Sequence, residues 1–62
     1  MKVTVRKAFV AEQRLRTVQA AELVEYKLVG VHVHLLVPGA SPVVMTRKEF
    51  SERLSDGTLQ KI

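Results

Sequence analysis

The stretch that decides the fold covers residues 28–57 and reads LVGVHVHLLV (28–37), PGASP (38–42), VVM (43–45) and TRKEFSERLSDG (46–57). Between residues 31 and 37 every odd position is Val or Leu, and His32 and His34 occupy two of the even positions. This period of two is typical of a strand with one buried face. The stretch therefore predicts a strand, a tight turn, a second strand and a capped helix.

The apolar face changes at Gly30. Before it, the apolar residues fall mainly on even positions, as in Val24, Tyr26 and Leu28, and after it they fall on odd positions. A one-residue slip of register moves every side chain to the other face, and a β-bulge is the usual remedy. We expect a strand to be under way by Val24 or Tyr26, with a bulge or bend within residues 28–31.

The segment 38–42 is predicted to be a turn. Pro38 and Pro42 have no backbone N–H, so both are expected outside the ladder of the sheet. The strand resumes at Val43 and ends by Thr46. Because the connection is short, the two strands are expected to be antiparallel neighbours.

The helix that follows, over residues 46–56, has signals at both ends. Thr46 and Glu49 have the spacing of a capping box, and Met45 and Phe50 have that of a hydrophobic staple. Gly57 can adopt the positive φ that ends many helices. The last five residues are interpreted as a tail, with Leu59 or Ile62 packing back onto the protein or completing an interface.

The N-terminal segment predicts a first strand over residues 2–10. Val3, Val5 and Phe9 occupy odd positions, and this alternation gives the strand one buried face. Lys7 falls on the buried side, which suggests a position near an edge where its long stem can reach water.

Residues 11–25 are predicted to contain a second helix. They include no Gly or Pro and are rich in Ala, Glu, Gln, Leu and Arg, which favour helices. A shorter helix capped by Thr17 is an alternative. The competing interpretation is a strand over residues 14–18, which would make the N-terminal half a hairpin.

The predicted fold class is α+β, in one domain of 62 residues. It comprises a small three-stranded, mostly antiparallel sheet with the C-terminal helix and the second helix within residues 11–25 packed on one face. The alternative is a mainly β, small barrel-like sheet with a single C-terminal helix. The expected core comprises Val3, Val5, Phe9, Val31, Val33, Leu35, Val37, Met45, Phe50 and Leu54.

The composition excludes several classes of protein. The apolar fraction of 47% argues against intrinsic disorder, and the absence of Cys excludes disulfides and thiolate zinc sites. The net charge of +4 disfavours an acidic mimic of DNA and allows a nucleic acid or an acidic protein as partner. Neither a signal peptide nor a run approaching the roughly 20 apolar residues of a membrane span is present, so the cytoplasm is the expected location.

His32 and His34 are the one residue pair with potential chemistry. Two residues apart on a strand, their side chains project from one face at roughly 6.5–7 Å between Cα atoms. Such a pair can chelate a metal, but zinc needs at least a third protein ligand, which the sequence does not place. With Lys27 or Arg47 to hold a phosphate, the pair could also act as acid and base in a metal-independent ribonuclease, a remote alternative.

Arg47 and Lys48 lie in the first turn of the C-terminal helix, where the helix dipole disfavours cations. One interpretation is an anion site at the helix N-terminus, and the other is a pair of solvated side chains. A basic surface is a further hypothesis, in which the first strand lies beside the histidine strand. Its members would be Thr4, Arg6, Arg14, Arg16, Lys27, His32 and His34.

No nucleophile elbow, catalytic Cys or carboxylate pair occurs, and we expect no enzymatic activity, no cofactor and no metal ion. In size and in its lack of recognisable sites, the chain resembles the small accessory open reading frames of phages and mobile elements. The first functional hypothesis is a non-enzymatic protein-binding module, such as a regulator or inhibitor of a larger host complex, that acts through an exposed sheet face or strand edge. The alternative is a basic nucleic-acid-binding accessory protein.

The residues expected to contact a protein partner are Tyr26, His32, His34, Leu36, Arg47 and Lys48. Strand addition at an edge is the simplest route to a partner complex or to a homodimer.

Overall fold

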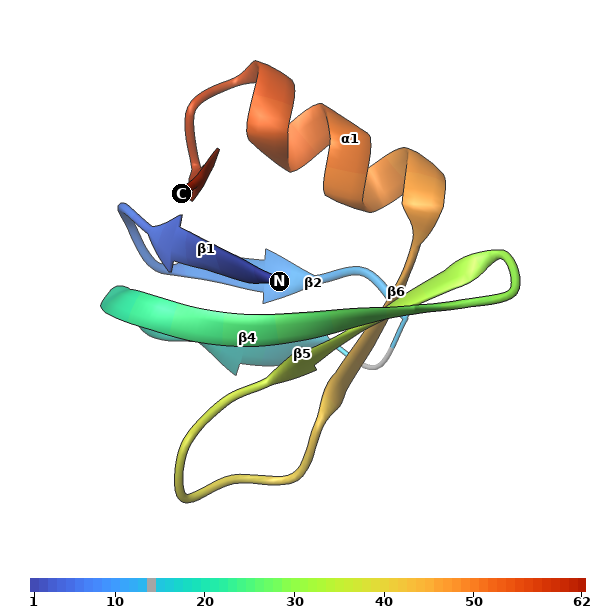
Figure 1. Cartoon of the computed structure of the whole chain (residues 1–62), viewed down its shortest axis with the longest axis horizontal. Helices are drawn as coiled ribbons and strands as arrows, with labels where there is room; N and C mark the ends of the chain where they lie inside the picture. The colour runs from blue at the N-terminus through green and yellow to red at the C-terminus, as the bar shows by residue number, and fades with distance from the viewer. Residues whose placement is uncertain (14) are drawn as a thin grey trace.

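The computed structural model describes residues 1–13 and 15–62. In this part of the chain, a five-stranded antiparallel sheet, a two-stranded hairpin and one helix enclose the core (Figure 1). The elements along the chain are β1 (Lys2–Val5), β2 (Phe9–Ala11), β3 (Arg16–Val18), β4 (Ala21–Val29), β5 (His32–Leu36), β6 (Val43–Thr46), α1 (Arg47–Ser55) and β7 (Leu59–Lys61). The predicted α+β class is confirmed, but the sheet has five strands rather than three.

The order of strands across the large sheet is β6-β5-β4-β1-β7. Strands β4, β5 and β6 follow one another as a meander, and the connection 37–42 between β5 and β6 is the turn expected from its prolines. After α1 the chain returns to the far side of the sheet, where β7 pairs antiparallel with β1. This pairing brings the two ends of the chain together, and the Ile62 N–H donates a hydrogen bond of 3.4 Å to the Lys2 carbonyl.

The change of face at Gly30 comes from a complete reversal of the chain. The bulge or bend predicted within residues 28–31 is therefore a hairpin loop, and the regular pairing of the two flanking strands excludes a bulge there. Gly30 and Val31 form a two-residue hairpin loop between β4 and β5, with φ of +58° at Gly30. A glycine at the first central position is typical of a type II′ turn, which suits the twist of paired strands. This loop places Tyr26 opposite Leu35, so an even position and an odd position share one face.

A register irregularity does occur, but at the other end of β4. Val3 pairs with Val24, whereas Val5 pairs with Ala21, so two residues of β4 lie opposite Thr4. Two residues facing one is the arrangement of a β-bulge. The Thr4 hydroxyl donates a hydrogen bond of 2.8 Å to the Glu22 carbonyl at this irregularity.

The second helix predicted within residues 11–25 is wrong, because this segment holds β3 and most of β4. The competing strand interpretation is confirmed for Arg16–Val18, while Arg14 lies outside the described residues. Val18 and Val24 are fully or almost fully buried, so strand pairing and burial outweigh the helix propensity of their neighbours.

The first strand is shorter than predicted. β1 ends at Val5, and β2 begins only at Phe9 and pairs with β3 instead of continuing the large sheet. Lys7 lies in the connection between them and is exposed, so its predicted position on a buried side is wrong.

The helix α1 begins and ends close to the predicted residues. Thr46 is the N-cap, and its hydroxyl accepts a hydrogen bond of 3.1 Å from the backbone N–H of Glu49. Asp56 is the C-cap, and Gly57 follows with φ of +86°. Leu59, in the segment predicted as a tail, is buried as part of β7.

The core lies between one face of the sheet, the helix α1 and the β2–β3 hairpin. Its buried apolar residues are Val3, Val5, Phe9, Ala11, Val18, Val24, Tyr26, Val33, Leu35, Val43, Met45, Phe50 and Leu59. Most of the predicted core is confirmed, and Val37 and Leu54 pack against it partly buried. The predicted burial of Val31 is wrong, because this residue lies in the hairpin loop with 71% of its surface exposed.

Among the described residues, no helix combines the length and the apolar character needed to cross a membrane.

Candidate functional site

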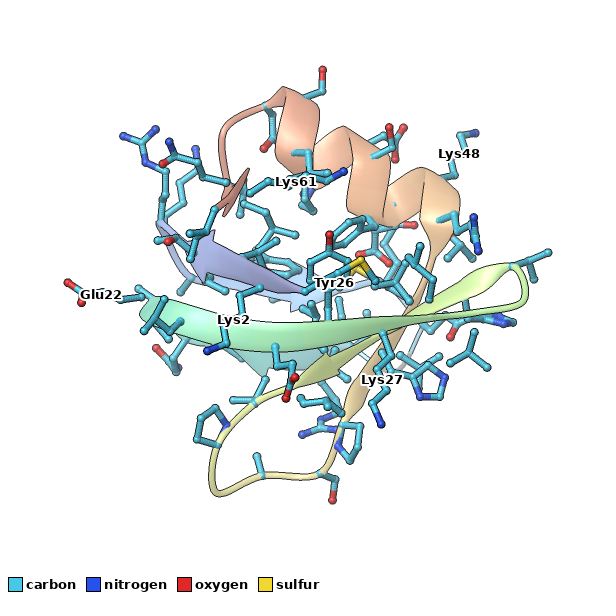
Figure 2. The ribbon with its side chains drawn as sticks, viewed as in Figure 1. Lys2, Glu22, Tyr26, Lys27, Lys48 and Lys61 are labelled. Carbon is cyan, nitrogen blue, oxygen red and sulfur yellow. The ribbon has the colours of Figure 1, made fainter. Side chains whose placement is uncertain are left out.

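The candidate site is the sheet face that points away from α1. Strand alternation separates the buried side chains of β4, β5 and β6 from those on the opposite side. We define the outer face as this second set: Glu25, Lys27, Val29, His32, His34, Leu36, Val44 and Thr46. Figure 2 shows the two sides at one point of β4, where Tyr26 projects toward α1 and Lys27 projects away from it.

The two histidines lie in the middle of the outer face, each flanked by a β4 and a β6 side chain. The rows across the sheet are Lys27–His34–Val44 and Val29–His32–Thr46. The backbone N–H of Arg47 donates to the Val31 carbonyl at 3.0 Å, which makes the odd positions of β5 the hydrogen-bonded partners of β6. His34 and Val44 are therefore a non-hydrogen-bonded pair, the kind whose side chains lie closest together.

The outer face is a mixture of apolar and polar side chains. Val29 is 48% exposed, and Leu36, Val44 and both histidines are partly exposed. A solvated sheet face usually carries polar residues at such positions. Three aliphatic side chains beside two imidazoles are therefore available to a contacting molecule.

One of the two cations predicted to lie near the histidine pair, Lys27, is found there. Lys27 is the direct register partner of His34, so an ammonium group and an imidazole share one row. A third metal ligand is not brought to them, since the described residues contain no group of three His, Cys, Asp or Glu side chains able to hold a metal ion.

Tyr26 does not belong to this surface, and its predicted position on the exposed sheet face is wrong. It is only 6% exposed, and its ring lies 4.9 Å from the ring of Phe50 at a tilt of 44°. The two-residue loop after β4 is the reason, because it turns the even positions of β4 toward the core and the even positions of β5 outward.

Arg47 and Lys48 occupy different environments. The Arg47 Nε atom donates a hydrogen bond of 2.8 Å to the Gly30 carbonyl, next to the backbone bond from Arg47 to Val31. This contact with the β4–β5 loop gives a structural reason for a cation in the first turn of α1. Lys48 is exposed and projects away from the body of the protein (Figure 2).

The predicted basic surface is not assembled as expected. β4, and not β1, lies beside the histidine strand, so Thr4 and Arg6 are separated from β5 by a whole strand. Arg16 lies elsewhere, where its Nη1 atom donates a hydrogen bond of 2.9 Å to the Pro42 carbonyl. Of this set, Lys27 is the basic residue that the described structure brings next to the histidines, and Arg14 lies outside the described residues.

Sequence reasoning missed Val29 and Val44 as members of the outer face. The signal for Val44 is its even position on a strand whose odd positions, Val43 and Met45, are buried. For Val29 the signal required the two-residue loop, since only that loop places Val29 opposite His32.

No protein-family model matches the chain, and neither a curated protein nor a solved structure matches it, so its function has to be argued from its own geometry.

Proposed function

We propose that the chain is a non-enzymatic protein-binding module that docks on a larger partner through the outer face. The observation that carries this proposal is the surface of β4, β5 and β6 opposite α1, where Leu36 and Val44 remain partly exposed beside His32 and His34. Covering such a face removes apolar area from water, which contributes roughly 25 cal/mol for each Å². A module of this size would act by occupying a surface of its partner, as a regulator or an inhibitor does.

The placement of the aromatic residues favours a protein over a nucleic acid as the partner. All three aromatic side chains of the chain, Phe9, Tyr26 and Phe50, are buried. Surfaces that bind single-stranded nucleic acids commonly offer exposed rings on which bases stack. The outer face has only imidazoles for that purpose, whereas its aliphatic groups suit a protein surface.

The test is affinity capture from an extract of the native host, with and without nuclease, using the wild-type protein and two variants. The double variant His34→Thr with Leu36→Lys removes an imidazole and an aliphatic group while keeping a strand-forming residue at position 34. The control Ser51→Lys adds the same charge at an exposed position of α1. Thermal unfolding of each variant checks that the fold is kept.

We expect the wild type and Ser51→Lys to retain the same protein after nuclease treatment, and the double variant to lose it. Equal capture by a folded double variant would rule out the outer face as the contact. A partner that disappears with nuclease would instead support the nucleic-acid alternative.

A further inference from the structure

The free edge of β7 carries backbone groups without a partner among the described residues. Thr58 accepts a hydrogen bond from the Arg6 N–H at 2.8 Å, and the Ile62 N–H donates to the Lys2 carbonyl at 3.4 Å. In an antiparallel ladder, successive residues turn their N–H and C=O groups to opposite sides. The N–H and C=O groups of Leu59 and Lys61 therefore point away from β1, at the end of the strand order.

A surface depression of about 460 Å³ lies next to this edge. It is lined by Arg6, Leu54, Gly57, Leu59, Gln60 and Lys61. The depression thus lies between the C-terminal end of α1 and β7, with Leu54 as an aliphatic wall. A second depression of about 310 Å³ shares Arg6 and Gly57 with the first and adds Lys7 and Asp56.

The charge around the edge is positive. The basic side chains that line the two depressions are Arg6, Lys7 and Lys61, and Figure 2 shows Lys61 on the α1 side of the sheet. Asp56 is the one carboxylate among these lining residues, and it already pairs with Arg53 at 3.3 Å. The edge therefore offers alternating backbone donors and acceptors within a field that favours anions.

We propose that the β7 edge binds an extended, acidic segment of a partner protein, which adds to the sheet as a further strand. Strand addition uses the backbone groups for affinity and neighbouring depressions for alternate side chains. In the bound segment, an acidic side chain would lie beside Arg6 or Lys61, and an aliphatic side chain would lie beside Leu54. This proposal concerns a different surface from the outer face, so its test does not depend on whether the outer face binds a partner.

Two other occupants are less well matched to the edge. A second copy of the chain would bring two basic clusters together across the new strand pair, which is unfavourable. The phosphates of a nucleic acid would use the cations and the N–H groups but not the C=O groups of Leu59 and Lys61, because phosphate oxygens only accept hydrogen bonds.

The first test is an NMR titration of ¹⁵N-labelled protein at low salt. The probes are a capped peptide of alternating Glu and Val, the same peptide with Lys in place of Glu, and an oligothymidylate. We expect saturable shifts from the acidic peptide at Leu54 and residues 57–62, and binding weaker by about tenfold or more for the basic peptide. No shifts with the acidic peptide, equal shifts with the basic peptide, or tighter binding of the oligonucleotide at these residues would overturn the proposal.

The second test is the variant Lys61→Pro, which removes an outward N–H without removing a bond to β1. Pro is tolerated at the free side of an edge strand. Lys61→Gln is the matched control, since it loses the charge but keeps the N–H. We expect Lys61→Pro to abolish the peptide shifts and Lys61→Gln to weaken them only partly; equal binding by both variants would contradict strand addition.

Hydrogen exchange on the wild type keeps the proposal testable if Lys61→Pro does not fold. In the free protein, the Lys61 amide should exchange faster than the Gln60 amide, and the acidic peptide should slow it. Slow exchange of the Lys61 amide in the free protein would contradict the proposal, because the edge would then already be covered. Light scattering would show whether the protein is a monomer, covered by its own chain, or a dimer, covered by a second copy.

Discussion

Glu49 makes the backbone hydrogen bond that its local sequence predicts, but its carboxylate bonds to a residue far away in the chain. Its backbone N–H bonds to Thr46 as a capping box requires, but its carboxylate does not complete the box. Instead Oε2 accepts a hydrogen bond of 3.0 Å from the backbone N–H of Glu12, just after β2. With only 3% of its surface exposed, Glu49 joins α1 to the β2–β3 hairpin from inside the protein.

Replacing Glu49 tests this connection. Glu49→Ala leaves the Glu12 N–H without its acceptor, and we expect a loss of about 1–3 kcal/mol in the free energy of unfolding. Glu49→Gln keeps an oxygen acceptor of the same reach and should lose clearly less. Urea denaturation of both variants measures the difference, and equal losses would show that the hydrogen bond to Glu12 contributes little.

The charge of Asp56 makes stability depend on acid pH. Hydrogen bonds from Thr58 lower the pKa of the Asp56 carboxyl below its ordinary value of 3.8; the side chain has the larger effect, followed by the backbone N–H at 2.8 Å. The positive charges of Arg53 and Lys7 lower this pKa further, while partial desolvation of the carboxylate raises it. Because the folded pKa lies below the unfolded one, the stabilisation is complete above the unfolded value. It is lost as the pH falls through the folded value.

Asp56→Asn isolates this contribution. We expect the wild type to be more stable than Asp56→Asn at neutral pH, and the difference to shrink as the pH falls below 3.8. Thermal unfolding of both proteins across this range measures it. A difference that stays constant with pH would mean that the ionised carboxylate makes no specific contribution.

At the scale of elements, the β4–β5 hairpin is the feature that the sequence pattern detected but did not explain. The change from even to odd apolar positions is real, and the two-residue loop at Gly30 and Val31 is its cause. α1 holds this loop in place, because Arg47 bonds to the carbonyls of both loop residues.

Gly30→Ala is expected to destabilise the protein by about 1–2 kcal/mol, because a side chain disfavours the positive φ of this position. Outside Gly30 and its two chain neighbours, no atom of the described structure lies within 4 Å of the position a Cβ would take, so crowding by other parts of the protein makes no contribution. Gly30→Asn is the matched control, since Asn tolerates positive φ better. Chemical denaturation should rank the wild type first, Gly30→Asn second and Gly30→Ala last; any other order would argue against backbone strain.

For the whole molecule, stability depends on a small core. A domain of this size buries only about 60% of the surface that its unfolded chain exposes. The sheet, α1 and the β2–β3 hairpin each contribute buried residues to one cluster. Loss of one central side chain should therefore remove a large part of the total stability.

Leu35→Ala tests the dependence on this core. Leu35 is fully buried in β5, and truncation of such a leucine typically costs about 2–5 kcal/mol. Leu28→Ala is the control, because Leu28 lies on the neighbouring strand with 45% of its surface exposed. Circular dichroism should show Leu35→Ala largely unfolded or melting far below Leu28→Ala; similar melting curves would mean that the core is not centred on β5.

The candidate site was only partly predictable for the same reason as the fold. His32, His34 and Leu36 could be placed together from alternation within one strand, and the described structure places them on the outer face. Tyr26 could not be placed, because its face depends on the loop that separates β4 from β5. A pattern within one strand reports shared faces, whereas the face of the next strand depends on how the chain reverses.

The sequence by itself determined the features that depend on neighbours a few residues apart. These include the turn at residues 38–42, the strand from Val43 to Thr46 and the ends of α1, where caps and glycine act locally. The tertiary structure alone decided the rest: β3 and β4 in place of a helix, the burial of Tyr26 and the pairing of β7 with β1. Those outcomes depend on partners far away in the chain, whose burial and backbone hydrogen bonds outweigh local propensity.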